Sequence, residues 1–487
     1  MGLRLSELVR RDLDVDPMIA GVTADSRKVA PGFLFAALPG SKVDGGDFVP
    51  RAVSAGAAAV LGARPMAGMG VPVIVASDPR RAYALAAAAF HGAQPGTCVA
   101  VTGTNGKTSV AAFCRQVFAK AGRRAASMGT LGVRISPPAG QGADEQITPP
   151  GLTTPDAADV AELMATLARK DVTHLALEAS SHGIDQRRLD GVTLTAAGFL
   201  NLTQDHLDYH GAMGVYRAAK LRLFETLLPR GATAVLNADS DAYPVFAAAA
   251  VSAGQTVFSV GEAGQGLRLV ARAATPDGQR LTLAADGGTH EVLLPLAGAF
   301  QASNVLVAAG LCLAAGIALD DILPALETLE GAPGRLQRVG AGANGGEAYV
   351  DYAHTPDGLE TVLRALRPHV RGRLIVVFGA GGDRDRTKRP IMGRIAGELA
   401  DVAIVTDDNP RGEDPAAIRA EVRAGAANLT EIGDRREAIR AGAAMLTDGD
   451  VLVVAGKGHE QGQTAAGVTH PFDDVQETLS VLGCADG

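Results

Sequence analysis

One pattern occurs three times in the C-terminal third of this chain: a short apolar segment is followed at once by a glycine or a turn and then by a helical stretch. The segments are RLIVVF before GAGG, DVAIV before TDDN, and DVLVVA before GKG. Short apolar runs without polar alternation are typical of strands buried on both faces. The pattern therefore predicts an open, doubly wound parallel sheet, whose ligands bind beyond the carboxyl ends of the strands.

A second series of strands and helices fills the middle of the chain. CVAVTG, HLALEA, AAGFLN and ATAVLN alternate with helical stretches and predict a mostly parallel sheet. GLRLVARAA, RLTLAAD and EVLLPLAG predict an antiparallel excursion before a helix over residues 301–315. The breaks HGAQPG and LEGAPG separate three predicted α/β domains, the first with the short strands GFLFAAL, AAVLGA and VPVIVA. Their expected bounds are residues 1–94, 95–331 and 332–487.

The composition excludes several classes of protein. With 487 residues, of which 47% are hydrophobic and 20% charged, the chain fits a globular protein of about two to four domains. The net charge of -8 disfavours a nucleic-acid-coating surface, and no apolar run approaches the roughly 18 to 20 residues of a membrane span. The first residues lack an apolar signal core. We expect a cytoplasmic monomer whose cysteines, Cys98, Cys114, Cys312 and Cys484, are thiols without metal-ligand spacing.

The segment VTGTNGKTSV joins one of the central strands to the helical stretch VAAFCRQVFAKAG. Its glycines and the helix N-terminus present N–H groups to an anion, Lys107 can reach terminal phosphates, and the Thr108 hydroxyl can ligate Mg²⁺. The common phosphate-loop spacing needs a glycine where this chain has Val101, so the fit is to a shorter variant. GK followed by Ser or Thr also recurs by chance, but the order of strand, glycines, lysine and helix predicts an ATP site. Its residues are Gly103, Thr104, Asn105, Gly106, Lys107, Thr108 and Ser109.

Two strands bring candidate metal ligands beside this loop. Glu178 ends the strand HLALE, and His206 follows the strand AAGFLN. Carboxylate oxygens beside a phosphate loop suit Mg²⁺, with a neutral imidazole as a less usual ligand. On position alone, Glu178 could also be a solvated acid, and His206 could cap a helix or pack.

Lys220 lies in the segment VYRAAKLRLFETL, which predicts a helix. By itself it reads as a surface lysine. The apolar face of the helix would include Val215, Ala218, Ala219 and Leu223.

Nine motifs occur in order along the chain: TGTNGKTS, LEASSHGIDQRRL, NLTQDHLDYHG, YRAAKLRLF, PGRLQRV, DYAHTPDGLE, FGAGGDRDRTKRPIMG, TDDNPRGEDP and AGKGHE. Together they resemble the Mur ligases of bacterial peptidoglycan synthesis. The resemblance implies an ATP-dependent amide ligase with an N-terminal UDP-binding domain, a central ATPase domain and a C-terminal Rossmann-like domain. In that family a substrate carboxylate attacks ATP to form an acyl phosphate, and the amine of an amino acid then displaces phosphate.

The resemblance also implies a catalytic set of Lys107, Glu178, His206 and Lys220. Thr108, Glu178 and His206 would serve the metal ions. Lys220 would be carbamylated, because a carbamate offers Mg²⁺ an anionic oxygen pair where an ammonium would repel it.

Further ATP contacts of the family match Asn304 and Arg335. At Gln301 this chain departs from the family, which usually has F-N-x-x-N there. Four residues of the C-terminal domain belong either to the closed active site or to a structural ion-pair set: Asp351, His354, Lys388 and Arg389.

The implied substrate contacts fall in two groups. Loops that resemble the family's UDP site contain Ala24, Ser26, Ser41, Lys42 and Val43, although polar loops of this kind are commonly only turns. The positions that match contacts with the muramoyl peptide are Thr153, Thr154, Ser180, Gln186 and Arg188, whereas the neighbouring Arg187 reads as solvated.

The family's members differ in the amino acid that they add. Those that add meso-diaminopimelate to UDP-N-acetylmuramoyl-L-alanyl-D-glutamate carry D-N-P-R, as here. Arg411 suits the distal carboxylate, and Glu460 suits the distal ammonium. The implied pocket contains Arg384, Asp408, Asn409, Pro410, Arg411, Gly456 and Glu460. The alternatives are a lysine-adding or folylpolyglutamate-type ligase, which Arg411 and the UDP-type domain disfavour, and an ATP-switched regulator without catalysis.

Overall fold

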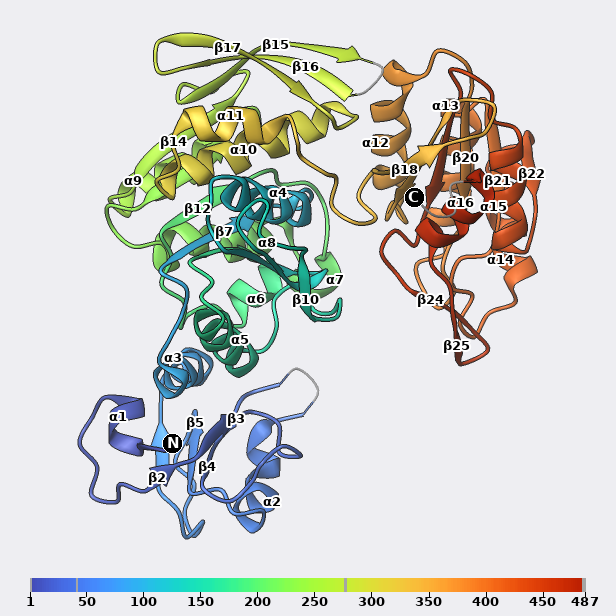
Figure 1. Ribbon diagram of the computed structural model, residues 1–487. Coiled ribbons are helices and arrows are strands. Elements are labelled where there is room, and N and C mark those ends of the chain that lie inside the picture. Colours follow the sequence, from blue (N-terminus) through green and yellow to red (C-terminus); the bar gives the residue numbers. More distant parts are fainter. Residues whose placement is uncertain (1, 41–42, 276–277, 484–487) are drawn as a thin grey trace. The chain divides into compact units, whose positions relative to one another are not determined.

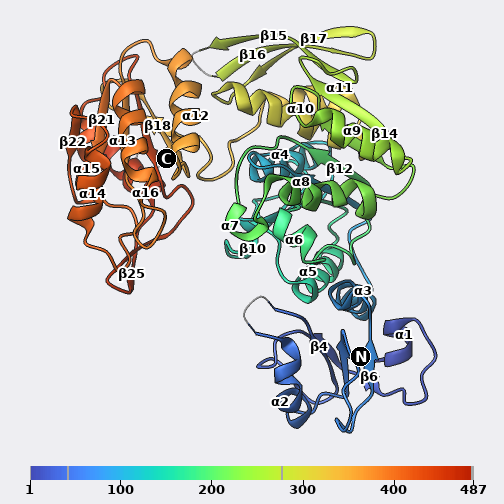
Figure 2. The same cartoon turned by 180° about the vertical axis from the view of Figure 1, so that it is seen from behind.

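The structure is a computed structural model that describes residues 2–40, 43–275 and 278–483 (Figure 1, Figure 2). The chain divides into two compact units, residues 1–268 with 306–322 and residues 269–305 with 323–487. The sheets are mostly parallel and lie among helices, so the predicted α/β class is confirmed. The three domains with bounds at residues 94 and 331 stay a prediction.

The first part of the first unit is a parallel sheet, β3-β4-β5-β6, between helices on both faces (Figure 1). Leu34 and Ala36 of β4 pack with α1 and α3, whereas Phe35 and Ala37 pack towards α2. Alternating side chains therefore join one strand to two cores. The elements are β1 Leu3–Arg4, α1 Leu5–Val9, β2 Met18–Ile19, β3 Gly21–Thr23, β4 Phe33–Ala37, η1 Gly45–Phe48, α2 Val49–Ser54, β5 Ala59–Gly62, β6 Val73–Val75 and α3 Pro79–His91.

The second part of the first unit is built on the strand order β10-β9-β8-β11-β7-β12-β13-β14. The strands from β8 to β14 run parallel, while β9 and β10 extend β8 in antiparallel pairing. The predicted central strands are thus confirmed. The elements are β7 Thr97–Thr102, α4 Lys107–Lys120, β8 Ala125–Gly129, β9 Gly132–Ser136, β10 Glu145–Thr148, α5 Ala157–Arg169, β11 His174–Glu178, α6 Ser181–Asp185, β12 Ala196–Phe199, α7 Leu207–His210, α8 Met213–Arg222, η2 Leu223–Leu227, β13 Thr233–Asn237, α9 Tyr243–Ser252 and β14 Thr256–Gly261.

The antiparallel excursion is also present. β16 pairs antiparallel with β17, with Gln279 opposite Leu294 and Ala285 opposite Gly288. The helix expected over residues 301–315 spans 299–314. None of the described helices is long and apolar enough to cross a membrane. The elements of this stretch are β15 Leu267–Thr275, β16 Gly278–Ala285, β17 Gly288–Leu294, α10 Ala299–Ala314 and α11 Leu319–Leu326.

The second unit contains the doubly wound sheet, with strand order β18-β19-β23-β20-β21-β22. All its pairs are parallel except β18 with β19. Val376 of β20 packs in one core with α12 to α14, and Val377 packs in the other with α15 and α16, which confirms that the strand is buried on both faces. The elements are β18 Gln337–Ala341, β19 Glu347–Asp351, α12 Pro356–Leu366, η3 Arg367–His369, β20 Leu374–Phe378, α13 Lys388–Leu399, β21 Val402–Val405, α14 Pro415–Arg423, β22 Leu429–Glu431, α15 Arg435–Ala444, β23 Val451–Ala455, β24 Gly462–Ala465, β25 Val468–Pro471 and α16 Asp474–Leu482.

A buried ion pair joins α15 to α16 on the second face of this sheet. The side chains of Arg435 and Asp474 are both 0% exposed. Arg435 donates to the two carboxylate oxygens of Asp474 at 2.7 Å each, and its Nη2 also donates to the carbonyl oxygen of Ala455 at 3.0 Å. The neighbouring Arg436 forms a similar fork with Glu477, but Arg436 is 51% exposed.

Arg435→Leu should lower the free energy of unfolding by about 3 to 5 kcal/mol, because it leaves the Asp474 carboxylate buried without its cation. Arg436→Leu removes the same type of side chain from the exposed pair and should cost about 1 kcal/mol or less. Urea unfolding of both variants, followed by circular dichroism, measures the difference. Equal losses would show that the burial of the Arg435 pair has no energetic consequence.

Candidate active site

The phosphate-binding loop connects β7 to α4 and curls around its own lysine. Gly106, with a left-handed φ of 90°, is the N-cap of α4. The Nζ of Lys107 donates to the carbonyl oxygens of Gly103 and Thr104 at 2.9 Å each. The lysine and the helix N-terminus thus share one loop, as in sites that hold phosphate at a helix N-terminus.

Asn201, two residues beyond the end of β12, fixes the other side of this loop. Its Oδ1 accepts from the N–H groups of Thr104 and Asn105 at 3.1 and 2.9 Å, and its Nδ2 donates to the carbonyl oxygen of Asn105 at 3.2 Å. Parallel pairing of Phe199 with Thr102 brings this asparagine to the loop. Sequence analysis missed Asn201, although a polar residue shortly after an apolar strand is a usable signal.

Glu178 ends β11, opposite Val101 of β7, and is 3% exposed. Its Oε2 accepts from the Thr108 hydroxyl and its Oε1 from the N–H of Thr130, both at 2.9 Å. Thr130, which sequence analysis did not single out, also shares a 2.9 Å hydrogen bond with the hydroxyl of Thr153. A carboxylate in contact with a hydroxyl fits the hard oxygen ligands that Mg²⁺ prefers.

Lys220 is buried, which corrects the expectation of a surface lysine. α8 turns Tyr216, Ala219 and Lys220 inward, with Lys220 1% exposed. Val215 and Ala218, which were assigned to the apolar face, are exposed. Ala219 and Leu223 are buried as predicted, so the predicted apolar face was right at two of its four residues. Alanine and valine are compatible with either face, which explains the error at Val215 and Ala218.

The environment of Lys220 favours its neutral amine. The Nζ donates to the carbonyl oxygen of Gly103 at 2.6 Å and lies 4.5 Å from the centroid of the Tyr216 ring. Burial, and after it the positive charge of Lys107, lower the pKa of Lys220 well below its usual value. An uncharged amine is the form that can react with carbon dioxide.

His206 is the N-cap of α7, with a left-handed φ of 53° and a side chain that is 46% exposed. Its Nε2 lies 3.4 Å from Oδ2 of Asp205, and its ring centroid lies 4.8 Å from that of His182. Within residues 2–40, 43–275 and 278–483, no group of three or more His, Cys, Asp or Glu side chains is placed to hold a metal ion. The structure thus brings Thr108 and Glu178 together, and the metal-ligand role of His206 stays a prediction.

The residues expected to contact the muramoyl peptide gather beside Glu178. The Thr154 hydroxyl donates to the carbonyl oxygen of Glu178 at 2.9 Å and accepts from the N–H of Ser180 at 3.1 Å. Arg188 donates to the carbonyl oxygen of Thr154 at 2.5 Å and to Oε1 of Gln186 at 2.8 Å. These side chains therefore form one hydrogen-bonded cluster at the carboxyl end of β11.

Two contacts from the α3 region flank this cluster. The Nε of Arg187 lies 2.9 Å from Oδ2 of Asp78, so the expectation that Arg187 is solvated was wrong. The Tyr83 hydroxyl donates to Oδ1 of Asp156 at 2.6 Å. Asp78 and Asp156 are the N-caps of α3 and α5, so both contacts fix helix starts.

A cavity of about 720 Å³ opens beside the loop expected to hold UDP. Ala24 and Ser26 line it together with Tyr83 and Phe48, and the basic side chains of Arg27 and Lys28 lie on its wall. These residues offer a ring surface and cationic groups, but the carboxylates of Asp25, Asp156, Asp159 and Glu162 also line the cavity. Of the other predicted contacts, Val43 is 52% exposed, and Ser41 and Lys42 lie outside the described residues.

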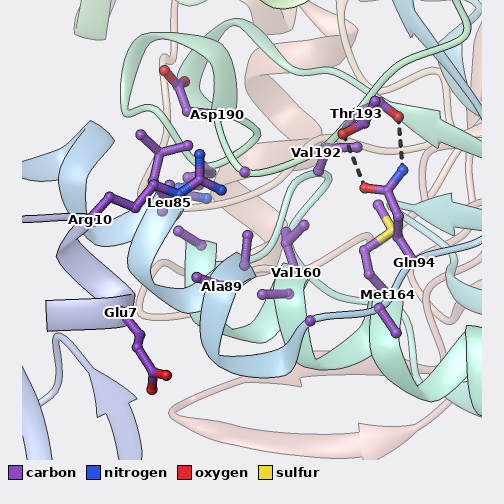
Figure 3. Close-up of a pocket in the computed structure, with 18 residues that line it drawn as sticks. Glu7, Arg10, Leu85, Ala89, Gln94, Val160, Met164, Asp190, Val192 and Thr193 are labelled. Carbon is purple, nitrogen blue, oxygen red and sulfur yellow. Dashed lines mark hydrogen bonds between the residues drawn. The ribbon is translucent and has the colours of Figure 1, made fainter. Parts of the chain in front are cut away.

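A second cavity, of about 640 Å³, lies among α1, α3, α5 and the segment after α6 (Figure 3). Its walls include the apolar side chains of Leu85 and Met164. Gln94 closes one side by donating to the carbonyl oxygen of Thr193 at 2.9 Å and accepting from its N–H at 3.0 Å. Of the predicted site residues that the structure describes, Arg188 alone lines this cavity, so it is not the expected active site.

Asn304 and Arg335, the expected ATP contacts outside the loop, belong to the second unit. The Nδ2 of Asn304 donates to Oε1 of Gln301 at 3.0 Å, and both side chains are buried. Gln301, which replaces the family's first asparagine, is therefore the direct partner of Asn304. The guanidinium of Arg335 lies 4.5 Å from the centroid of the Tyr352 ring.

Arg389 belongs to a structural ion-pair set. Its side chain is 0% exposed and lies 2.8 Å from Glu413 and 2.7 Å from Glu421. Its guanidinium is thus committed to these carboxylates. Arg384, assigned to the amino-acid pocket, is exposed, and its predicted role remains a prediction.

Asp351, His354 and Lys388 lie near the ends of β19 and α13. Asp351 accepts from the N–H groups of Leu336 and Ala353 at 2.6 and 2.7 Å, and burial raises its pKa to about 6. The Nζ of Lys388 donates to the carbonyl oxygen of His354 at 2.8 Å. A place for these three residues in the closed active site stays a prediction, whereas the guanidinium of Arg389 is paired with Glu413 and Glu421.

The residues expected to bind the amino acid lie mainly on the loops after β21 and β23. The Nδ2 of Asn409 donates to Oε2 of Glu460 at 2.9 Å, which joins the two loops. The Nη1 of Arg411 donates to the carbonyl oxygen of Gly382 at 2.8 Å, and Arg411 has a left-handed φ of 53°. The predicted pocket residues Asp408, Asn409, Pro410, Arg411, Gly456 and Glu460 thus lie on two connected loops.

Gly456 and Lys457 directly follow β23. Gly456 has a φ of 124°, and a Cβ at this position would lie 3.2 Å from Oδ2 of Asp408. Lys457 is 0% exposed and donates to Oδ1 of Asn409 at 2.9 Å. Sequence analysis missed Lys457, although it stands between two residues that were singled out.

The chain matches the family models described as Mur ligase family, catalytic domain, over residues 18–92, Mur ligase middle domain over 101–312, and Mur ligase, glutamate ligase domain, over 334–458. It is 70% identical over 487 residues to a Caulobacter vibrioides protein named UDP-N-acetylmuramoyl-L-alanyl-D-glutamate--2,6-diaminopimelate ligase, covering 100% of both chains. The chain belongs to the Mur ligase family. The resemblance seen in the nine motifs is confirmed.

Two further comparisons extend along the whole of this Mur ligase. A protein of the same name from Agrobacterium fabrum is 53% identical over 469 residues, covering 96% of this chain and 94% of the relative. A solved structure of a ligase of that name is 34% identical, with a TM-score of 0.75 and 99% of each chain covered. As a member of the family, the chain is an ATP-dependent amide ligase.

His459, in the AGKGHE motif, provides a pH test of the second unit. Its ring centroid lies 5.0 Å from that of Tyr352. Burial, and after it the charge of Arg335, lower the pKa of His459 to about 4. Because its unfolded pKa is about 6.5, the neutral ring contributes stability that is fully present above pH 6.5 and is lost as the pH falls through 4.

On acidification from pH 7 to pH 4, the wild-type protein should therefore lose about 2 to 3 kcal/mol more unfolding free energy than His459→Gln does. Urea unfolding at several pH values measures this difference. His470→Gln, at an exposed histidine, should behave as the wild type does. If His459→Gln and the wild type lose stability equally, the buried neutral histidine makes no contribution.

Proposed function

We propose that this Mur ligase adds meso-diaminopimelate to UDP-N-acetylmuramoyl-L-alanyl-D-glutamate. The reaction consumes ATP and uses Mg²⁺ as its metal ion. The single observation that carries the amino-acid assignment is that Arg411 and Glu460 lie on two loops joined by the hydrogen bond from Asn409 to Glu460. The name of the 70% identical relative describes ligation of 2,6-diaminopimelate to the same nucleotide peptide.

In the proposed reaction, the substrate carboxylate attacks the γ-phosphorus of ATP. The bond to the bridging oxygen breaks, which gives ADP and an acyl phosphate. The diaminopimelate amine then attacks the acyl carbon, and the tetrahedral intermediate releases phosphate while the amine loses a proton. A carboxylate alone resists amine attack because oxide is a poor leaving group, whereas phosphate leaves readily.

The first step brings a carboxylate against a triphosphate, so cations must offset the repulsion. Lys107, in the phosphate-binding loop, would supply one positive charge. Mg²⁺, held by Thr108 and Glu178, would supply the rest. Carbamylated Lys220 and His206 complete the proposed metal environment.

We assign each part of the substrates to the predicted residues according to where those residues lie. We assign UDP to the cavity that Ala24 and Ser26 line, and the acidic peptide to the cluster of Thr153, Thr154, Ser180, Gln186 and Arg188. Arg411 would hold the distal carboxylate of diaminopimelate, and Glu460 its distal ammonium. A lysine-adding ligase has no use for that arginine, and a regulator without catalysis has no use for the pocket.

ADP release by the purified protein tests this function, with the nucleotide substrate and either meso-diaminopimelate or L-lysine. We expect release with meso-diaminopimelate and little with lysine. Arg411→Lys should lower kcat/KM for diaminopimelate roughly 10- to 100-fold, because lysine cannot supply a two-pronged contact. The KM for ATP should stay within about twofold.

Arg423→Lys, at an exposed arginine of α14 paired with Glu431, is the matched control and should retain wild-type kinetics. Equal rates with lysine and diaminopimelate would contradict the specificity. Loss of ATP affinity in Arg411→Lys would mean that Arg411 serves the nucleotide instead.

The carbamate on Lys220 can be observed directly. In ¹³C-bicarbonate, the wild-type protein should give a carbamate carbon signal that Lys220→Arg lacks, because the permanently charged guanidinium cannot add carbon dioxide. The variant should also lose at least about 100-fold in kcat. Lys120→Arg, on the exposed end of α4, keeps the signal and the rate. A wild-type spectrum without the carbamate signal would exclude the modification.

A further inference from the structure

The β24–β25 hairpin contacts the loop that contains Arg411. In both views it lies at one end of the C-terminal sheet (Figure 1, Figure 2). The N–H of Arg411 donates to the carbonyl oxygen of Thr464 at 2.9 Å, and the carbonyl oxygen of Arg411 accepts from the N–H of Ala466 at 2.7 Å. These two bonds form a parallel bridge between Arg411 and Ala465. Both backbone polar groups of Arg411 are therefore bonded to the short segment 464–466.

Asn409 is oriented by the same segment. Its Oδ1 accepts from the N–H of Thr464 and from the Nζ of Lys457, both at 2.9 Å. Because the oxygen faces two donors, the amide nitrogen must face the other way, and it donates to Oε2 of Glu460 at 2.9 Å. A flipped amide would set its NH₂ against two donors and its oxygen against a carboxylate.

Two more contacts close the connection. The Nε2 of Gln463 donates to the carbonyl oxygen of Asp408 at 2.7 Å, and the Nζ of Lys457 donates to the carbonyl oxygen of Gly462 at 2.7 Å. The Nζ of Lys457 also lies 3.5 Å from Oδ1 of Asp408. The side chain of Lys457 is 0% exposed, so it joins the hairpin to the Arg411 loop through buried contacts.

We propose that Lys457 and Gln463 are positioning residues for amino-acid selection. Through them, the segment 457–466 holds Arg411 in its left-handed backbone conformation. The same segment orients the side-chain amide of Asn409 so that its NH₂ group faces Glu460. This inference rests on the proposed function and extends it. Neither residue needs to touch the substrate.

The distal end of diaminopimelate explains why one segment should position both Arg411 and Glu460. Its carboxylate and ammonium are attached to one carbon, so the cation and the carboxylate that bind them must keep a fixed separation. Bidentate contacts are sensitive to small displacements of either partner. A segment bonded to both loops sets that separation, whereas two independently mobile loops would not.

The test compares Gln463→Met and Lys457→Met with Thr469→Val. Gln463→Met keeps the length of the side chain and removes the donor. Thr469→Val removes a hydrogen bond within the hairpin, the one to the Thr464 hydroxyl, and none to the Arg411 loop. Steady-state kinetics with meso-diaminopimelate, L-lysine, ATP and the nucleotide substrate give the KM for each and the preference for diaminopimelate.

We expect the KM for diaminopimelate to rise roughly tenfold in Gln463→Met and more in Lys457→Met, with kcat and the KM for ATP within about threefold. The preference over lysine should fall by the same factor. Thr469→Val should match the wild type. Gln463→Met alone decides the outcome if Lys457→Met does not fold.

Three results would overturn the inference. An unchanged KM for diaminopimelate in Gln463→Met would do so while leaving the proposed function intact. Parallel increases in every KM would indicate general loosening of the domain rather than positioning. A wild-type protein that does not use diaminopimelate would overturn the proposed function and this inference together.

Discussion

Parallel pairing of β11 and β12 with β7 is the constraint on which the geometry around the phosphate-binding loop depends. The register places Val101 opposite Glu178 and Thr102 opposite Phe199, so three strands end at one level. The residues just beyond those ends must then share a small volume. The Thr108 hydroxyl is hydrogen-bonded to Glu178, and Asn201 is hydrogen-bonded to the phosphate-binding loop. A shift of one residue in the pairing of β11 with β7 would turn Glu178 to the other face of the sheet.

Lys220 and Lys457 are both buried, and they differ in what surrounds their amino groups. Burial lowers the pKa of both Lys220 and Lys457. The second largest effect on each pKa comes from a neighbouring charge. Lys107 lowers the pKa of Lys220 further, whereas Asp408 raises the pKa of Lys457. Lys220 therefore lies where a neutral, reactive amine is favoured. Lys457 has carboxylates and carbonyls around it, which suits a charged group that holds loops together.

The part of the fold that could be predicted from sequence depends on local order. Buried strands followed by turns have a short-range signature, so the sheets and the loop around Lys107 were predictable. The burial of Lys220 was not, because a helix with alanines on several sides gives no clear face. The contacts of Lys457 and Gln463 join residues 48 and 55 positions apart, and no local pattern specifies such pairs. The ion pairs of Arg389 with Glu413 and Glu421 could not be predicted for the same reason.

Left-handed backbone at non-glycine residues recurs in the loops that carry the predicted site: Arg187, His206 and Arg411 have φ values of 62°, 53° and 53°. Each such residue costs on the order of 1 to 2 kcal/mol relative to a relaxed conformation. Glycine would remove that cost but would also remove the side chain. At Arg411 the two backbone hydrogen bonds to the hairpin offset the strain. The direction of the guanidinium is then set by the backbone as well as by its rotamers, which is what a two-pronged contact requires.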